Sequence, residues 1–117
     1  MTSLQDYATY REIKSQTEAW AQALELTQKL SLPKAGDYGQ VIFTGCGSTY
    51  YLSLAAAALY QELTSCSARG VPASELLFNS QTVLTNPKTL LVAVSRSGTT
   101  SETVKATEKF KAEKRGE

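Results

Sequence analysis

Short apolar runs alternate along this chain with segments whose apolar residues recur at helical spacing. Such runs predict strands that are buried on both faces of a sheet, and the segments between them predict helices. The predicted strands span residues 41–44, 66–71 and 89–94. The predicted helices span residues 3–30, 52–63, 73–78 and 101–114, with a linker at 31–40 and a loop at 79–88.

The alternation of strands and helices predicts an α/β fold: a three-layer, flavodoxin-like parallel sheet that follows a long N-terminal helix. In the common 2-1-3 strand order, the turns after strands 1 and 3 leave toward opposite faces, and a crevice opens between them. We expect two parts, a helical segment at residues 1–36 and the α/β domain at residues 37–117. Pro33 and Gly36 mark the boundary between them.

The turn that precedes the last predicted helix is rich in hydroxyl groups. Six of the nine residues from 95 to 103 carry a hydroxyl, and Gly98 lets the backbone approach a ligand closely. The first N–H groups of a helix lack intrahelical partners and, with the helix dipole, attract anions. A phosphate group fits such a turn. Helix capping by Thr100 or Ser101 is the simpler reading, but it explains one or two of these hydroxyls.

A second turn of this kind follows the first predicted strand. It reads Gly45-Cys46-Gly47-Ser48-Thr49 and also precedes a helix. In a 2-1-3 sheet the two turns, about 50 residues apart, meet over one crevice. The sequence therefore predicts a single ligand site built from both turns.

Composition narrows the classes of function. The chain has 117 residues, 42% of them hydrophobic, and a net charge of +1, which indicates one ordinary globular domain. The charge gives no reason to expect a nucleic acid or an anionic membrane as partner. No apolar run approaches the roughly 18 residues of a membrane span, and the first residues lack the features of a signal peptide. We expect a cytoplasmic protein.

The residue types also limit the chemistry. The chain has no histidine, which removes the commonest general base and zinc ligand, and two cysteines are too few for a disulfide framework. We assign no catalytic residue, metal or cofactor. A dinucleotide site is disfavoured because Tyr50 stands where the third glycine of its motif is required. Cys46 fits a small buried thiol better than a nucleophile, and Arg96 fits either an anion or a carboxylate partner.

The two turns resemble those of the sugar isomerase (SIS) domain family. The second carries the pattern S-x-S-G-x-T-x-E-T over residues 95–103, and the first reads Gly45-Cys46-Gly47-Ser48-Thr49-Tyr50. Residues 73–76 and parts of the N-terminal helix are also similar. The likeness is closest to the isomerase part of glucosamine-6-phosphate synthase and to related ketose/aldose phosphate isomerases and amino-sugar phosphate deaminases.

The resemblance implies a phosphosugar site. Its phosphate would be bound by residues of the second turn, while Ser48 and Thr49 would touch the phosphate or the sugar from the first. The family usually has Thr before Ser at these two positions and often Gln where this chain has Arg96. The implied substrate-binding residues are Ser48, Thr49, Ser95, Arg96, Ser97 and Thr100.

The resemblance also implies a shortened chain. SIS domains have about five strands, and the family's catalytic groups lie in portions that we do not find here, so residues 37–117 would be the N-terminal part of an incomplete SIS-type domain. The expected function is phosphosugar binding within an aldose–ketose isomerase or amino-sugar phosphate enzyme; whether this chain is itself an enzyme stays open. The alternative is a non-catalytic sugar-phosphate sensor. We expect a homodimer or other self-association, because the apolar third strand would form an open sheet edge.

Overall fold

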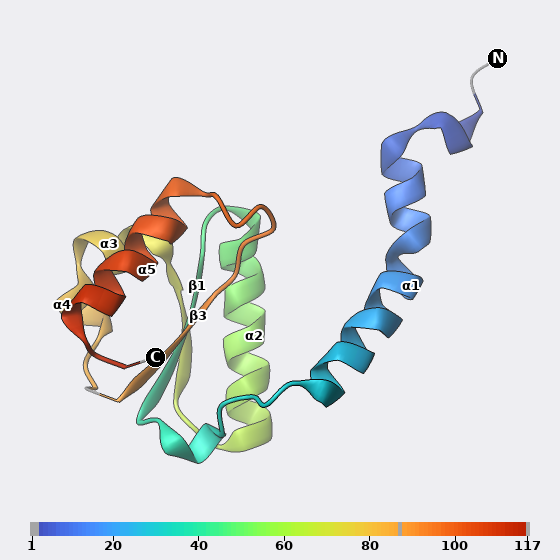
Figure 1. The fold of residues 1–117 in the computed structure, drawn as a ribbon. Coiled ribbons are helices and arrows are strands. Elements are labelled where there is room, and N and C mark those ends of the chain that lie inside the picture. Colours follow the sequence, from blue (N-terminus) through green and yellow to red (C-terminus); the bar gives the residue numbers. More distant parts are fainter. Residues whose placement is uncertain (1–2, 87, 117) are drawn as a thin grey trace. The chain divides into compact units, whose positions relative to one another are not determined.

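The computed structural model describes residues 3–86 and 88–116, which fall into two compact units divided between Pro33 and Lys34 (Figure 1). The first unit contains a 3-10 helix, η1 (Leu4–Asp6), and a long helix, α1 (Ala8–Lys29). The prediction of one uninterrupted helix over residues 3–30 was wrong, because Tyr7 between them is extended, with φ −82° and ψ 128°. Ser3 and Asp6 close η1 with a capping box. No residue of α1 is buried.

A parallel sheet of three strands organises the second unit. The strands are β1 (Gln40–Gly45), β2 (Ala68–Pro72) and β3 (Thr89–Ala93), in the spatial order β2-β1-β3. Phe43 in the middle strand pairs with Gly70 on one side and Val92 on the other. The predicted 2-1-3 parallel order is therefore confirmed, and it places the carboxyl ends of β1 and β3 side by side.

Helices cover the two faces of this sheet in three layers (Figure 1). The helix α2 (Ser48–Thr64) lies on one face, while α3 (Ala73–Phe78), α4 (Ser80–Val83) and α5 (Ser101–Glu113) lie on the other. The short α4 corrects the prediction of a loop over residues 79–88. It forms because Ser80 and Val83 are buried, and the preference of Asn and Ser for turns is overridden by this burial. The linker also contains a 3-10 turn, η2 (Ala35–Asp37).

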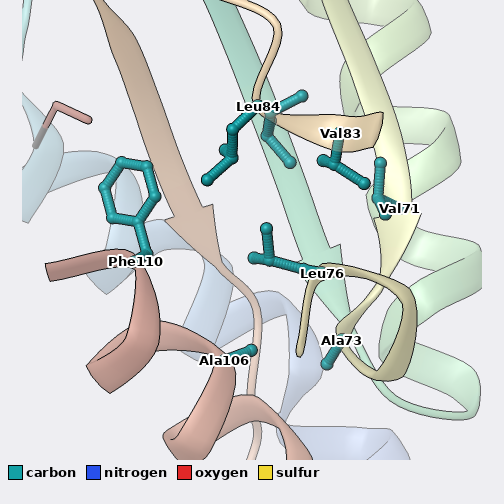
Figure 2. Close-up of a cluster of buried hydrophobic side chains, with 8 residues drawn as sticks. Val71, Ala73, Leu76, Val83, Leu84, Ala106 and Phe110 are labelled. Carbon is teal, nitrogen blue, oxygen red and sulfur yellow. The ribbon is translucent and has the colours of Figure 1, made fainter. Parts of the chain in front are cut away.

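The hydrophobic core lies between the sheet and the helices α3, α4 and α5 (Figure 2). Ile42 supplies its centre from β1 and is fully buried, and Leu76 from α3 is 1% exposed. Phe110 and Ala106 enter from α5, four residues apart and hence on one face of that helix. The cluster comprises Ile42, Val71, Ala73, Leu76, Val83, Leu84, Ala106 and Phe110. This packing fixes where α5 begins and therefore where the second turn lies.

The opposite face of the sheet is covered at short range by α2. A Cβ added to Gly70 would lie 2.8 Å from the Leu54 backbone N and Cα, so the strand reaches the helix backbone there. The helix turns Ser53 and Ala57 inward, and its leucine stripe remains exposed. Leu59 is 55% exposed and Leu63 is 74% exposed, although their helical spacing is typical of a core face.

The strand β3 lies at the edge of the sheet, as the predicted strand order requires. Its first residue pairs with the end of the described chain through a parallel bridge between Thr89 and Gly116, and the Thr89 N–H donates to the Arg115 carbonyl at 3.1 Å. Leu91 is half-buried and Ala93 is exposed. Among the described residues, no helix is both long and apolar enough to cross a membrane.

Candidate phosphate-binding pocket

A small pocket lies where β1 and β3 end, between the two glycine-containing turns. Its volume is about 280 Å³, close to the lower end of the range for ligand pockets in proteins. Carboxyl ends of parallel strands at a change of strand order are where α/β proteins bind ligands. The lining residues are Cys46, Ser48, Thr49, Arg96, Ser97 and Thr100. The two turns therefore meet at one pocket.

The first turn is closed by a single threonine. Gly47 precedes α2 with φ +60°, a conformation that favours glycine. The Thr49 hydroxyl accepts a hydrogen bond from the Cys46 N–H at 2.9 Å and donates to the Cys46 carbonyl at 2.9 Å. Gly45 packs against this threonine so closely that an added Cβ would lie 2.7 Å from Thr49 Oγ1. The turn is thus held in one shape by local contacts.

The second turn is closed by its serines. Gly98 has φ +71°, and its N–H donates to Ser95 Oγ at 3.0 Å. The Thr99 N–H donates to Ser97 Oγ at 3.2 Å, and the Thr99 hydroxyl lies 3.1 Å from the same oxygen. Both serine oxygens therefore act as acceptors within the turn, and the hydroxyl proton of each is left for another partner.

Charge at the pocket is positive. Arg96 carries the one formal charge among the lining residues that the structure describes, is exposed, and has no hydrogen bond or ion pair with another described residue. A guanidinium offers five donors in a planar fork that suits phosphate oxygens. The helices α2 and α5 both begin at this pocket, and their first N–H groups add partial positive charge.

A carboxylate beside the second turn is hydrogen-bonded to a neighbouring residue in the sequence. Glu102 stands in the first turn of α5, and the Ser101 hydroxyl donates to its Oε2 at 3.0 Å. A hydrogen bond from its own backbone N–H and then the bond from Ser101 lower the pKa of this carboxyl, with a smaller contribution from Lys105. Glu102 is not a lining residue of the pocket. The position of Glu102 favours a role in stabilising the N-terminus of α5.

Five of the six predicted binding residues line the pocket: Ser48, Thr49, Arg96, Ser97 and Thr100. The sixth, Ser95, lines a separate groove of about 410 Å³ along β3 and α5 instead. Cys46 lines the pocket although the residue pattern favoured a buried structural thiol; it is half-buried. Its position between Gly45 and Gly47 is the sequence feature that indicates a residue of the turn and therefore of the pocket.

These features define a class of protein: a parallel α/β domain with a small, positively charged, donor-rich pocket at the carboxyl edge of its sheet. Among the described residues, no carboxylate lines the pocket, and its hydroxyls and Arg96 offer hydrogen-bond donors.

The SIS domain family matches residues 37–116, and the chain belongs to this family. The chain is 35% identical over 74 residues to the glutamine–fructose-6-phosphate aminotransferase [isomerizing] of Helicobacter pylori. This alignment covers 63% of this chain and 12% of that protein. The protein of the same name from Pyrococcus horikoshii is 35% identical over 69 residues, covering 59% and 11%. The resemblance to the SIS family that the two turns indicated is thereby confirmed.

A solved structure shares the fold. The crystal structure of tagatose-6-phosphate ketose/aldose isomerase from Escherichia coli matches with a TM-score of 0.78 and 26% identity, over 92% of this chain and 32% of that one. The predicted SIS-type α/β fold is confirmed by this match. The chain spans about an eighth of the curated relatives it matches and about a third of the solved isomerase.

Proposed function

We propose that this chain binds the phosphate group of a sugar phosphate in the pocket between its two turns. The observation that carries the proposal is the convergence of Arg96, the hydroxyls and two helix starts on one pocket of about 280 Å³. The proposed substrate-binding residues are Ser48, Thr49, Ser95, Arg96, Ser97 and Thr100. Ser95 takes part by closing the second turn through the Gly98 N–H.

The proposed context is an aldose–ketose isomerase or an amino-sugar phosphate enzyme. The names of the relatives support this over the regulatory sensor, because they are an isomerizing aminotransferase and a ketose/aldose isomerase. In such an enzyme the phosphate would serve as a remote handle whose binding orients the reacting carbons. We place residues 37–117 in its phosphosugar-binding domain, residues 1–36 in a helical segment, and the protein in the cytoplasm.

We also propose that the chain forms a homodimer. The open edge of β3 and the exposed leucine stripe of α2, with Leu59 and Leu63 more than half exposed, are the surfaces that support self-association. The net charge of +1 supports the absence of a nucleic acid or membrane partner.

Calorimetric titration with fructose 6-phosphate and with fructose tests phosphate binding directly. The phosphorylated sugar is expected to bind and fructose is not, because the pocket offers donors to an anion. Inorganic phosphate should compete with the sugar phosphate. Equal heats for fructose and fructose 6-phosphate would refute the proposal.

Thiol alkylation gives an independent measurement with a built-in control. Cys46 lines the pocket, whereas Cys66 lies between α2 and β2, at the opposite end of the parallel strands. Both thiols are half-buried. Fructose 6-phosphate is expected to slow the alkylation of Cys46 by iodoacetamide and to leave Cys66 unchanged. Equal protection of the two thiols, or none, would place the ligand elsewhere.

A further inference from the structure

We propose that two copies of this chain pair through α2, with the two helices antiparallel and related by a two-fold axis near Ala57 and Ala58. This inference rests on the homodimer proposed above and assigns the surface through which it forms. The surface is the leucine stripe of α2, a band of apolar residues at helical spacing. The stripe comprises Leu52, Ala55, Ala56, Leu59 and Leu63.

The core of the second unit does not use the leucines of this stripe. On its inward side α2 buries Ser53 and Ala57 against the sheet. The ring of Tyr60 meets the ring of Phe43 edge-on, with 5.8 Å between the two ring centroids. The three leucines of the stripe are each more than half exposed. A contiguous apolar surface of this kind on a folded domain marks an interaction site.

The shape of the stripe fits a second helix. Ala55 and Ala56 stand at its centre, and the leucines stand on either side of them. Two packed helices come closest where they cross, and small side chains at that point allow an axis separation near 8 Å. A flat partner, such as a membrane surface, would contact the leucines and leave a gap over the alanines. A helix that crosses at the alanines fills this gap.

The stripe is complementary to itself when one copy is reversed. Antiparallel pairing about the proposed axis sets Leu52 opposite Leu63 of the second copy. It also sets Ala56 opposite Leu59 of the second copy, so that a large side chain enters the space above a small one. Parallel pairing would set each alanine against the same alanine and leave a void at the centre of the contact.

Charge favours the same orientation. Glu62 is the one charged residue in the sequence of α2. The antiparallel arrangement separates the two copies of Glu62 by about 14 Å along the helices, which exceeds the screening length of about 8–10 Å in physiological salt. Parallel pairing would set these carboxylates side by side. The antiparallel order also places the negative end of each helix dipole beside the positive end of the other.

Disulfide cross-linking tests the orientation. In a background with Cys46→Ser and Cys66→Ser, the variants Leu52→Cys and Leu63→Cys are oxidised separately and as a mixture. The mixture is expected to give a cross-linked dimer, and each variant alone is not. The reason is that antiparallel pairing holds the two copies of either position about 17 Å apart, whereas a disulfide needs Cα atoms within about 7 Å. Cross-linking of a variant with itself, or none in the mixture, would overturn the antiparallel pair.

Sedimentation equilibrium tests whether α2 is the contact. Every sample carries Ala93→Lys, so that pairing through the edge of β3 does not contribute. Leu59→Gln is expected to weaken dimerisation by about tenfold or more. The matched control is Ala58→Gln, which introduces the same side chain about 100° around the helix from Leu59 and should stay within about twofold of the parent. Binding of fructose 6-phosphate should be equal in both variants, because neither residue lines the pocket.

The outcomes separate this contact from the proposals on which it rests. A dimer of unchanged strength in Leu59→Gln would overturn the α2 contact and leave the homodimer standing. A parent that is monomeric at every concentration would refute the homodimer itself. Phosphate binding is judged by its own calorimetric titration, which neither result alters.

Discussion

Replacing Ser97 with alanine isolates one donor of the second turn. Within the turn, Ser97 Oγ accepts from the Thr99 N–H at 3.2 Å and lies 3.1 Å from the Thr99 hydroxyl. Because the Thr99 hydroxyl is the donor in that contact, the proton of the Ser97 hydroxyl is available to a ligand in the pocket that the residue lines. The variant removes this donor and leaves Arg96 and the helix starts in place.

The magnitude follows from the charge of the ligand. A hydrogen bond to an ionised group contributes about 1.5–3 kcal/mol, which corresponds to a rise in Kd of roughly tenfold to a hundredfold. Folding should change little, because Ser97 and Thr99 are both exposed and water can replace the lost partner of the Thr99 N–H. We therefore expect weaker binding at nearly unchanged stability.

Calorimetric titration of the parent and of Ser97→Ala with fructose 6-phosphate measures this difference. Ser101→Ala is the matched control, because Ser101 lies in the same segment but donates to Glu102 and does not line the pocket. Its Kd should stay within about twofold of the parent, a free-energy change under 0.5 kcal/mol by the tenfold-per-1.4 kcal/mol relation. Equal Kd values for Ser97→Ala and the parent would refute the assignment of the second turn.

Four further outcomes are expected. Gly70→Ala should lower the free energy of unfolding by about 1–3 kcal/mol in urea, since its Cβ would lie 2.8 Å from the Leu54 backbone, and an unchanged midpoint would contradict the close approach of α2. The stability that Glu102 adds is present above its unfolded-state pKa and lost as pH falls through its lowered folded-state pKa, so the gap in melting temperature between parent and Glu102→Gln should close on acidification. The purified chain should not turn over fructose 6-phosphate, because it has no histidine and no carboxylate among the described residues lines the pocket; turnover that Glu102→Gln abolishes would disprove this. Sedimentation over a hundredfold dilution should show self-association near micromolar concentration that Ala93→Lys reduces, whereas a monomer at every concentration would argue against an open β3 edge.

The sequence determined the arrangement of the fold because its signals are local. Apolar runs of strand length, each followed by helical spacing, are sufficient to predict alternating strands and helices, and this alternation favours a parallel sheet in the order β2-β1-β3. The glycines and hydroxyls after β1 and β3 could be identified from the sequence because each turn is one continuous stretch of the chain. Gly47 and Gly98 both have positive φ, so the residue type reports the backbone conformation directly.

Tertiary packing decided what local signals could not. The residues Ser80–Val83 form a helix because burial of Val83 outweighs their preference for turns. The leucines of α2 face outward because the helix packs its small residues against the sheet, where Gly70 has no side chain to keep the two backbones apart. The hydrogen bonds of the hydroxyls that follow β1 belong to the same category. Ser48 and Thr49 are equivalent donors in sequence, and the position of the Cys46 backbone relative to Thr49 Oγ1 distinguishes them, because a hydroxyl has one proton to give.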